Sequence, residues 1–501
     1  MNIYLEIQKL IRYALDKNLI KEEDCIYSKN MILAVLRLDN FEKTEAVYEK
    51  TESPVEIIDN ILNWSYQKGV LKYNTPVYTD ILDTKIMNCL MPRPSEVVSN
   101  FYRKYEEDPK KATDYYYELS KNSNYIRTDR IAKNANWKVQ TDYGELDITI
   151  NLSKPEKDPK AIAEAKNIKS TGYPKCLLCK ENEGYLGRVN HPARQNHRII
   201  PMKIRKEKWF LQYSPYVYYN EHCIVLKKEH EPMKISKDTF DRLLEFTEKI
   251  PHYFIGSNAD LPIVGGSILS HDHFQGGNYE FAMAKASVKQ SIVYDKYPYI
   301  EVGILKWPMS VIRLRGKSRK EVSELAEIIL NKWRNYSDKD MEIIAYSDDI
   351  PHNTVTPIAR RRNDKFELDL VLRNNRLSSD YPMGIFHPHQ ELHHIKKENI
   401  GLIEVMGLAV LPARLKNELE KMSNYLLNEE LDIKKDESML KHINWFNQIK
   451  DKYKNLNNEN VINILKNEVG NKFITVLEHA GVFKDDEKGQ KAFVKFLKNI
   501  M

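Results

Sequence analysis

The residues with the clearest chemical potential lie in one short segment, residues 265–277. Within it, His271, His273 and Gln275 alternate, so an extended chain projects all three side chains to one face. The same segment contains glycines that let backbone N–H groups approach an anion, and serine hydroxyls that can donate to it: Gly265, Gly266, Ser267 and Ser270. Two imidazoles and an amide beside such a loop predict phosphoryl chemistry rather than a loop with incidental histidines.

Cys176 and Cys179 are the second chemical signal. Two thiols separated by two residues have the spacing of paired zinc ligands. A redox pair and a bare pair of buried cysteines are the alternatives. Five cysteines in 501 residues are too few for a disulfide scaffold.

Several polar residues elsewhere are candidates for substrate contacts. Arg127 and Arg130 lie three apart before a predicted strand, and the guanidinium fork suits phosphate oxygens; the alternative is a solvated basic turn. Asn190 could hydrogen-bond a ligand through its amide and Asn258 could hold a phosphate, although either could be a turn residue. The run at 360–362 is predicted to be a solvated basic turn.

Four histidines lie between residues 387 and 394. They could bind a second metal or a sugar phosphate, and Pro388 with its polar neighbours favours a substrate pocket near the site. His387, His389 and Arg373, which follows a predicted strand, are therefore candidate substrate-binding residues.

These motifs together resemble a known family. The alternation at 271–275 resembles the His-x-His-x-(His/Gln) signature of the histidine-triad superfamily, and its Gln form resembles the galactose-1-phosphate uridylyltransferases. Where the first class of that family has His-Pro-His, this chain has His271-Asp272-His273, as the second, bacterial class does. Four further stretches also look like the second class: 173–179, 187–192, 386–394 and 396–407.

The resemblance implies an activity. His273 would attack the α-phosphorus of UDP-glucose and release glucose-1-phosphate, and galactose-1-phosphate would then take the uridylyl group and leave as UDP-galactose. His271 and Gln275 would be the other catalytic residues, and because Gln275 has no titratable group it favours transfer over hydrolysis. The alternatives are a nucleotide-sugar phosphorylase of the same superfamily and, more distantly, a zinc-stabilised RNA-binding protein.

The resemblance also implies a cofactor and partners. A structural zinc ion would be held by Cys176, Cys179, His230 and His271, with His222 as an alternative ligand. No organic cofactor, nucleic acid or membrane is expected as a partner, and a homodimer is expected from the resemblance alone.

The hydrophobic pattern predicts the elements that position these residues. Apolar residues recur three or four apart up to about residue 105, with Ser95 as the expected cap of a helix, and again in 237–250 and 318–336. Alternating or apolar runs at 145–152, 223–226 and 366–372 predict strands. The predicted fold is α+β: two histidine-triad-like halves, 106–300 and 301–425, with mainly antiparallel sheets and packed helices, between a helical N-terminal region (1–105) and a helical tail (426–501).

Composition excludes other classes of protein. The chain is 42% hydrophobic and 30% charged, as globular proteins are, and its longest apolar stretch (400–411) is far shorter than the ~20 residues that span a bilayer. Its 77 basic and 71 acidic residues give a net charge of +6, which is mild for this length and argues against a dedicated nucleic-acid binder. The first residues lack the pattern of a secretory signal, so we expect a cytoplasmic protein.

Overall fold

The computed structural model describes residues 1–45, 50–153, 172–266 and 268–500. These residues form two compact units that each contain several chain segments. Unit 1 comprises Met1–Lys133, Ser153–Glu231 and His271–His273, and unit 2 comprises Asn134–Leu152, Pro232–Ser270 and Phe274–Met501. The chain therefore passes from unit 1 to unit 2 directly after His273.

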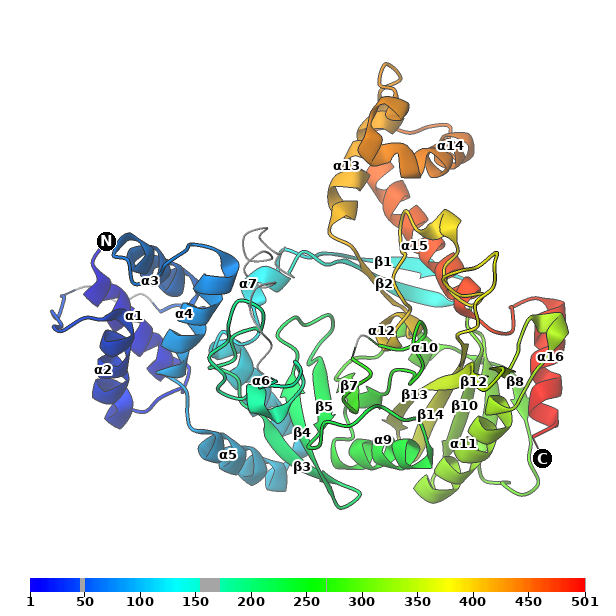
Figure 1. Cartoon of the computed structure of the whole chain (residues 1–501), viewed down its shortest axis with the longest axis horizontal. Helices are drawn as coiled ribbons and strands as arrows, with labels where there is room; N and C mark the ends of the chain where they lie inside the picture. Colours follow the sequence, from blue (N-terminus) through cyan, green and yellow to red (C-terminus); the bar gives the residue numbers. More distant parts are fainter. Residues whose placement is uncertain (46–49, 154–171, 267, 501) are drawn as a thin grey trace. The chain divides into compact units, whose positions relative to one another are not determined.

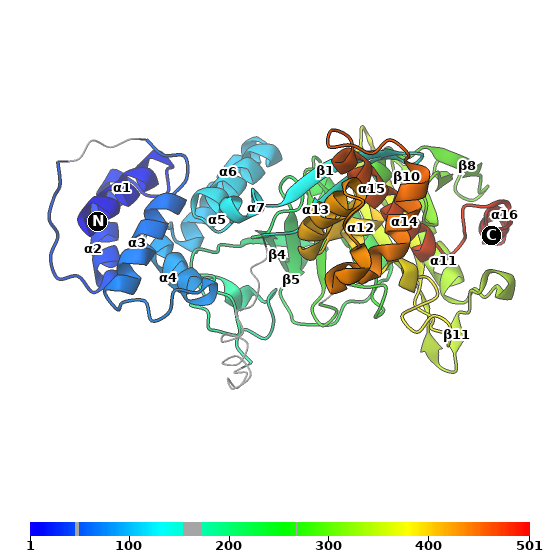
Figure 2. The same cartoon turned by 90° about the horizontal axis from the view of Figure 1, so that it is seen from above.

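Unit 1 begins with helices, as the apolar spacing predicted. They are α1 (Ile3–Asp16), η1 (Glu22–Asp24), α2 (Cys25–Leu36), α3 (Val55–Gln67), α4 (Pro76–Asn88), α5 (Pro94–Glu107), α6 (Pro109–Asn122) and α7 (Thr128–Ile131). Figure 2 shows α5 and α6 side by side. The prediction that Ser95 caps a helix is wrong: α5 starts at Pro94, whose ring presets the helical φ angle, so Ser95 lies in the first turn.

The rest of unit 1 is a short antiparallel sheet and the loops around it. Its strands are β3 (Ile200–Ile204), β4 (Glu207–Tyr213) and β5 (Cys223–Lys227), paired in that order, and a short helix, η2 (Lys180–Asn182), precedes them. β5 confirms the strand predicted at 223–226.

Unit 2 contains the larger sheet, whose strand order is β7–β6–β13–β14–β10–β9–β8 with antiparallel neighbours throughout. The bounds are β6 (Phe254–Gly256), β7 (His273–Gly277), β8 (Val288–Ile292), β9 (Glu301–Leu305), β10 (Val311–Gly316), β13 (Asn353–Arg362) and β14 (Lys365–Asn374). Helices α9 (Lys237–Lys249) and α11 (Arg319–Arg334) pack against this sheet and against each other (Figure 1). Both helices and β14 confirm predicted elements.

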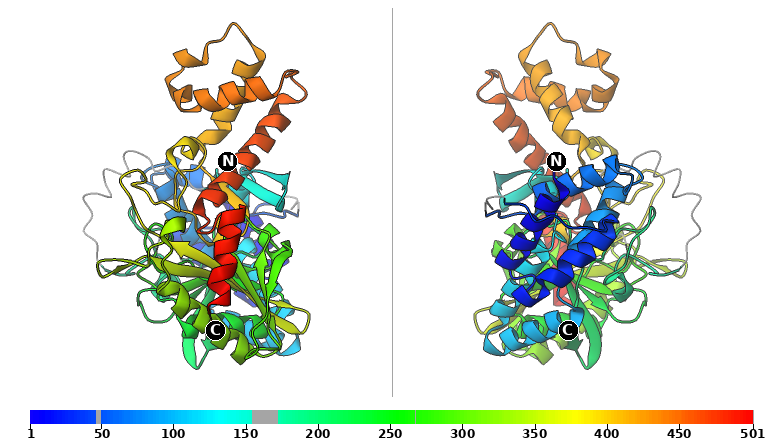
Figure 3. Two further views of the ribbon diagram at one scale, coloured as in Figure 1. Left: turned by 90° about the vertical axis from the view of Figure 1, so that its right-hand side faces the viewer. Right: turned by 90° about the vertical axis from the view of Figure 1, so that its left-hand side faces the viewer.

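A second sheet of unit 2 joins distant parts of the chain. β1 (Ala135–Thr141) pairs antiparallel with β2 (Gly144–Ile150), and β15 (Leu408–Leu411) runs parallel to β2. Figure 3 shows α15 (Val461–Ala480) beside α13 (Arg414–Leu427), and α15 also packs against β1. Gly470 permits this packing, because a Cβ atom there would lie 2.5 Å from Val139 Cγ1.

The remaining elements of unit 2 are short connections and the other helices of the tail. They are α10 (Ala282–Lys285), η3 (Lys339–Met341), β11 (Tyr346–Ser347), β12 (Ile350–Pro351), η4 (Gln390–Leu392), α12 (Leu402–Val405), η5 (Ile433–Lys435), η6 (Glu437–His442), α14 (Ile443–Lys452) and α16 (Glu487–Lys498). The α+β class with mainly antiparallel sheets is thus confirmed, as is the helical tail. Among the described residues, no helix is both long and apolar enough to cross a membrane.

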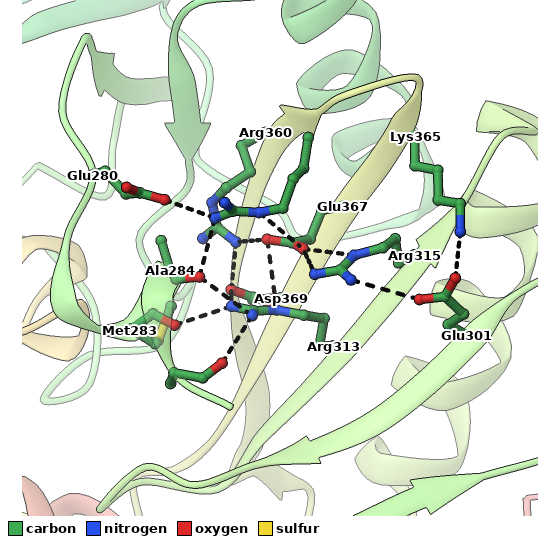
Figure 4. A network of polar contacts seen from close by, with 12 residues as sticks. Glu280, Met283, Ala284, Glu301, Arg313, Arg315, Arg360, Lys365, Glu367 and Asp369 are labelled. Atoms are coloured by element: carbon green, nitrogen blue, oxygen red, sulfur yellow. Dashed lines mark hydrogen bonds and ion pairs between the residues drawn. The ribbon is translucent and has the colours of Figure 1, made fainter. Parts of the chain in front are cut away.

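A buried ionic network crosses the centre of the larger sheet (Figure 4). Asp369 on β14 accepts hydrogen bonds from Arg313 Nε at 2.7 Å and from Arg360 NH1 at 2.8 Å. Glu367, also on β14, accepts from Arg360 NH1 at 2.5 Å and from Arg315 Nε at 2.9 Å. The prediction that 360–362 is a solvated turn is therefore wrong: all three arginines lie in β13, and Arg360 is buried with its charge balanced by two carboxylates.

Candidate active site and metal centre

Four side chains of unit 1 bring two thiols and two imidazole nitrogens together. Cys176 and Cys179 lie in the loop before η2, His230 follows β5, and His271 precedes β7. Cys176 Sγ lies 3.6 Å from Cys179 Sγ and 3.3 Å from His271 Nδ1. Cys179 Sγ lies 3.2 Å from His230 Nδ1 and 3.8 Å from His271 Nδ1. The four side chains can therefore hold one metal ion.

The distances fit a tetrahedral zinc site. Zinc bonds of ordinary length to sulfur and nitrogen place tetrahedral ligand atoms about 3.3–3.8 Å apart, close to the observed separations. His271 Nε2 donates to the carbonyl oxygen of Lys227 at 2.8 Å, which leaves Nδ1 for a metal. Burial raises the pKa of the Cys176 thiol to about 11, and a bound cation would act in the opposite direction by stabilising the thiolate. His222, the alternative ligand, is outside this cluster, and its ring packs on Tyr219 at 4.5 Å between centroids.

His273 is buried and held through one ring nitrogen. Its Nδ1 lies 2.7 Å from the carbonyl oxygen of His271, so Nδ1 carries the hydrogen and the lone pair is on Nε2. Burial lowers the pKa of His273 to about 4, so the ring is neutral near pH 7. β7 begins at His273, and its half-buried Gln275 therefore projects from the same face of that strand.

The segment before β7 is fixed by backbone hydrogen bonds within unit 1. Asp272 N donates to Glu231 O at 2.7 Å, and Lys227 N donates to Asp272 O at 3.0 Å. His271 and His273 thus have different environments. The ring of His271 contacts the cysteines, whereas the ring of His273 donates a hydrogen bond to the backbone carbonyl of His271. The geometry places a neutral imidazole, whose Nε2 lone pair could attack an electrophile, next to a cluster that could hold a metal ion.

Two models of one protein family match most of the chain. Residues 18–232 match the family described as "Galactose-1-phosphate uridyl transferase, N-terminal domain", and residues 245–444 match its C-terminal domain. The chain belongs to the galactose-1-phosphate uridyl transferase family.

Curated relatives match this family member over nearly its whole length. A "Galactose-1-phosphate uridylyltransferase" of Clostridium acetobutylicum is 58% identical over 98% of this chain and 99% of its own. A protein of the same name from Halalkalibacterium halodurans is 56% identical over 100% of this chain and 99% of its own. Another, from Bacillus subtilis, is 52% identical over 99% of this chain and 98% of its own. A solved structure, yeast Ap4A phosphorylase Apa2, covers 65% of this chain and 91% of its own at 12% identity and a TM-score of 0.33.

The glycine-rich loop of this uridyl transferase family member lies in unit 2. A Cβ atom on Gly265 would lie 2.5 Å from Ala259 O, and one on Gly266 would lie 2.7 Å from Asn258 Nδ2, so both glycines permit close packing within the loop. Asn258 Oδ1 accepts from Leu402 N at 2.9 Å, and Ser270 is exposed. Ser267 lies outside the described residues. The assignment of this loop to an anion stays a prediction.

The two candidate phosphate arginines are already paired with carboxylates in unit 1. Arg127 pairs with Asp83, and Arg130 pairs with Asp80 at 3.1 Å from NH1 to Oδ2. Both arginines line a cavity of about 420 Å³ whose wall also includes Asp59. A nucleotide phosphate would therefore have to compete with these carboxylates. Asn190 is exposed and accepts from Arg188 Nε at 2.7 Å.

The histidines of residues 387–394 do not share one environment. His389 stacks on Tyr381 at 4.0 Å and lies 4.2 Å from the ring of His479, whereas His394 Nδ1 contacts His442 Nδ1 at 2.8 Å. His387 is buried and its Nδ1 lies 3.1 Å from Pro388 O.

Sequence reasoning missed the partners of these histidines, because His442 and His479 come from the tail, which carries no local motif. His389, Glu391 and His479 form a second group of possible cation ligands.

Arg373, in β14, is buried and donates from Nη2 to Ile400 O at 2.9 Å.

Proposed function

We propose that this protein transfers a uridylyl group from UDP-glucose to galactose-1-phosphate through a covalent intermediate on His273. The observation that carries the proposal is the anchoring of His273 Nδ1 on the carbonyl of His271, because it leaves Nε2 as an oriented nucleophile. The names of relatives that align over nearly the full chain support the same reaction.

Two displacements at the α-phosphorus would complete the reaction. In the first, Nε2 forms a bond to phosphorus while the bond to glucose-1-phosphate breaks. The leaving oxygen belongs to a phosphate whose second pKa is about 6, so it needs no general acid. In the second, a phosphate oxygen of galactose-1-phosphate attacks the uridylyl-histidine, releases UDP-galactose and restores the free imidazole.

Gln275 would act by hydrogen bonding alone. Its amide has no titratable proton, and it can donate to a phosphoryl oxygen or to the uridylylated ring. With this role, Gln275 cannot deprotonate a water molecule. Water would therefore compete poorly with a sugar phosphate for the uridylyl group.

The other substrate contacts expected from the sequence are proposals of the same kind. They are Arg127, Arg130, Asn190, Asn258, Gly265, Gly266, Ser270, Arg373, His387 and His389. The four-region division, a homodimer and a cytoplasmic location are also proposals. Family membership sets aside the RNA-binding alternative, and replacement of galactose-1-phosphate by inorganic phosphate in the same assay would test for a phosphorylase.

We further propose that the four-ligand cluster holds zinc in a structural role. The ion would link the Cys176–Cys179 loop to His271, whose backbone carbonyl orients the ring of His273. Cys176, Cys179, His230 and His271 would supply all four ligands, which leaves no open position for substrate and matches a structural rather than a catalytic site.

Replacing Cys176 with Ser should reduce bound zinc from about one per chain to almost none and lower the melting temperature, because structural zinc contributes folding free energy. Elemental analysis and thermal denaturation measure the two effects. Cys25→Ser is the matched control, since Cys25 is a half-exposed thiol outside the cluster. The metal site would be refuted if the wild type contained no zinc and Cys176→Ser had the same melting temperature as the wild type.

Replacing Gln275 with His should slow transfer by about 10- to 100-fold, the value of one hydrogen bond to a charged group. It should also raise the release of UMP relative to transfer, because a group that can activate water returns to this position. Both rates can be followed by chromatography of UDP-glucose reactions. Gln275→Asn is the control, as it shortens the amide without adding a titratable group. An equal rise in hydrolysis in both variants would contradict the proposed role.

A further inference from the structure

Asn182 lies beneath the metal-binding loop of unit 1 with every polar hydrogen of its side chain in use. It is buried at the end of η2, and its Nδ2 donates to Cys176 O at 2.9 Å and to Cys179 O at 2.7 Å. A primary amide has two hydrogens, so one side chain binds the carbonyls of both cysteines. The Asn182 side chain therefore joins both cysteine carbonyls, in addition to the backbone hydrogen bonds from Cys179 N to Cys176 O at 3.3 Å and from Asn182 N to Cys179 O at 3.0 Å.

The remaining atom of the Asn182 amide fixes its orientation. Its Oδ1 lies 2.7 Å from His191 Nε2. Because the amide nitrogen faces two carbonyl oxygens, Oδ1 must be the acceptor and His191 Nε2 the donor. The two carbonyl oxygens disfavour a flipped amide, which would turn Oδ1 toward them, and the N–H of His191 stabilises the observed orientation by donating to Oδ1.

His191 is itself positioned by its neighbours in residues 187–192. These residues have no role in the proposed zinc site as described above. Arg188 and His191 exchange backbone hydrogen bonds of 2.8 and 2.9 Å, and the ring of Tyr185 meets the imidazole edge-on at 5.4 Å. A Cβ atom on Gly187 would lie 2.5 Å from Ala193 Cα, so this tight turn requires glycine there.

We propose that Asn182, locked by His191, is the positioning residue that shapes the metal-binding loop. The inference rests on the proposed metal site, because it concerns the two cysteines of that site. Hydrogen-bond partners of a metal-binding loop orient its ligands before the ion arrives, so their loss weakens metal binding even when all four ligands remain.

Asn182→Asp tests the proposal with an isosteric change in the full-length protein. A carboxylate accepts but cannot donate, so it would face the two carbonyl oxygens with negative charge. We expect zinc affinity, measured by competition with a chromophoric chelator, to fall about 10- to 100-fold. Asn100→Asp is the control, since Asn100 is a half-buried residue of α5 outside the loop.

The His191 variants separate loop positioning from a general effect on folding. His191→Gln keeps an N–H donor that can reach Asn182 Oδ1, whereas His191→Phe has none, so the Gln variant should retain more affinity for zinc than the Phe variant. The visible spectrum of Co²⁺-loaded protein should show altered tetrahedral bands in Asn182→Asp and unaltered bands in Asn100→Asp.

The outcomes distinguish two failures. Wild-type protein that binds no zinc would overturn the proposed metal site. Tight zinc binding by the wild type with unchanged affinity in Asn182→Asp, or equal affinities in the two His191 variants, would overturn the role of Asn182 and leave the metal site intact.

Discussion

Replacing His273 with Gly is expected to abolish the overall exchange between UDP-glucose and galactose-1-phosphate while the protein stays folded. Without the imidazole there is no carrier for the uridylyl group between the two displacements. Gly also leaves a space the size of the lost ring, so added imidazole should attack UDP-glucose from about the same position and yield uridylyl-imidazole. Chromatography of the reaction would detect this product.

Mass spectrometry of protein mixed with UDP-glucose, without an acceptor, gives the decisive measurement. The wild type should carry the uridylyl mass on His273, and the Gly variant should carry none. His252→Gly is the control, because His252 lies in a turn and has no proposed role in the reaction. A uridylyl group on another residue, or full exchange by His273→Gly, would refute the mechanism.

Replacing Asp369 with Ala should destabilise unit 2 by about 3–5 kcal/mol, the usual cost of breaking a buried ion pair from one side. The change would leave Arg313 and Arg360, whose side chains are 5% and 9% exposed, with Glu367 as their remaining buried counter-charge among the described residues. Urea denaturation followed by tryptophan fluorescence would measure the loss. The reaction chemistry should persist in the folded fraction.

Glu301→Ala is the matched control for this ionic network. Glu301 also pairs with basic residues, Lys365 and Arg315, but its side chain is 55% exposed, so its removal should cost about 0–1 kcal/mol. Equal losses for the two variants would show that burial does not set the energetics of the network.

The pH dependence gives an independent check on Asp369. Burial alone would raise the pKa of Asp369, but Arg313 and Arg360 outweigh it and hold this pKa below its ordinary value. The resulting stabilisation is present above the unfolded pKa of about 3.9 and is lost as the pH falls through the folded value. Asp369→Ala should therefore lose less stability than the wild type on acidification below about pH 4.

The sequence predicted the local elements because each follows from a period that neighbouring residues express. The three-to-four-residue spacing in 237–250 and 318–336 became α9 and α11, and the runs at 145–152 and 366–372 became β2 and β14. The same reasoning failed for Arg360, because a run of three arginines does not show that the next strand of the same hairpin places two carboxylates against the first of them. In this case β14 supplies Glu367 and Asp369.

The sequence by itself determined the chemistry available at residues 271–275 and the metal-ligand spacing of Cys176 and Cys179, since both are set by side-chain type and separation along the chain. The family resemblance named His230 and His271 as the other ligands, but only the tertiary structure placed their Nδ1 atoms 3.2–3.8 Å from the two sulfur atoms. It also decided that Asn182 and His191 support the loop that carries the cysteines. The physical reason is that a hydrogen bond or a metal ligand requires atoms within a few ångströms, and neither residue type nor spacing fixes such a distance across loops separated by tens of residues.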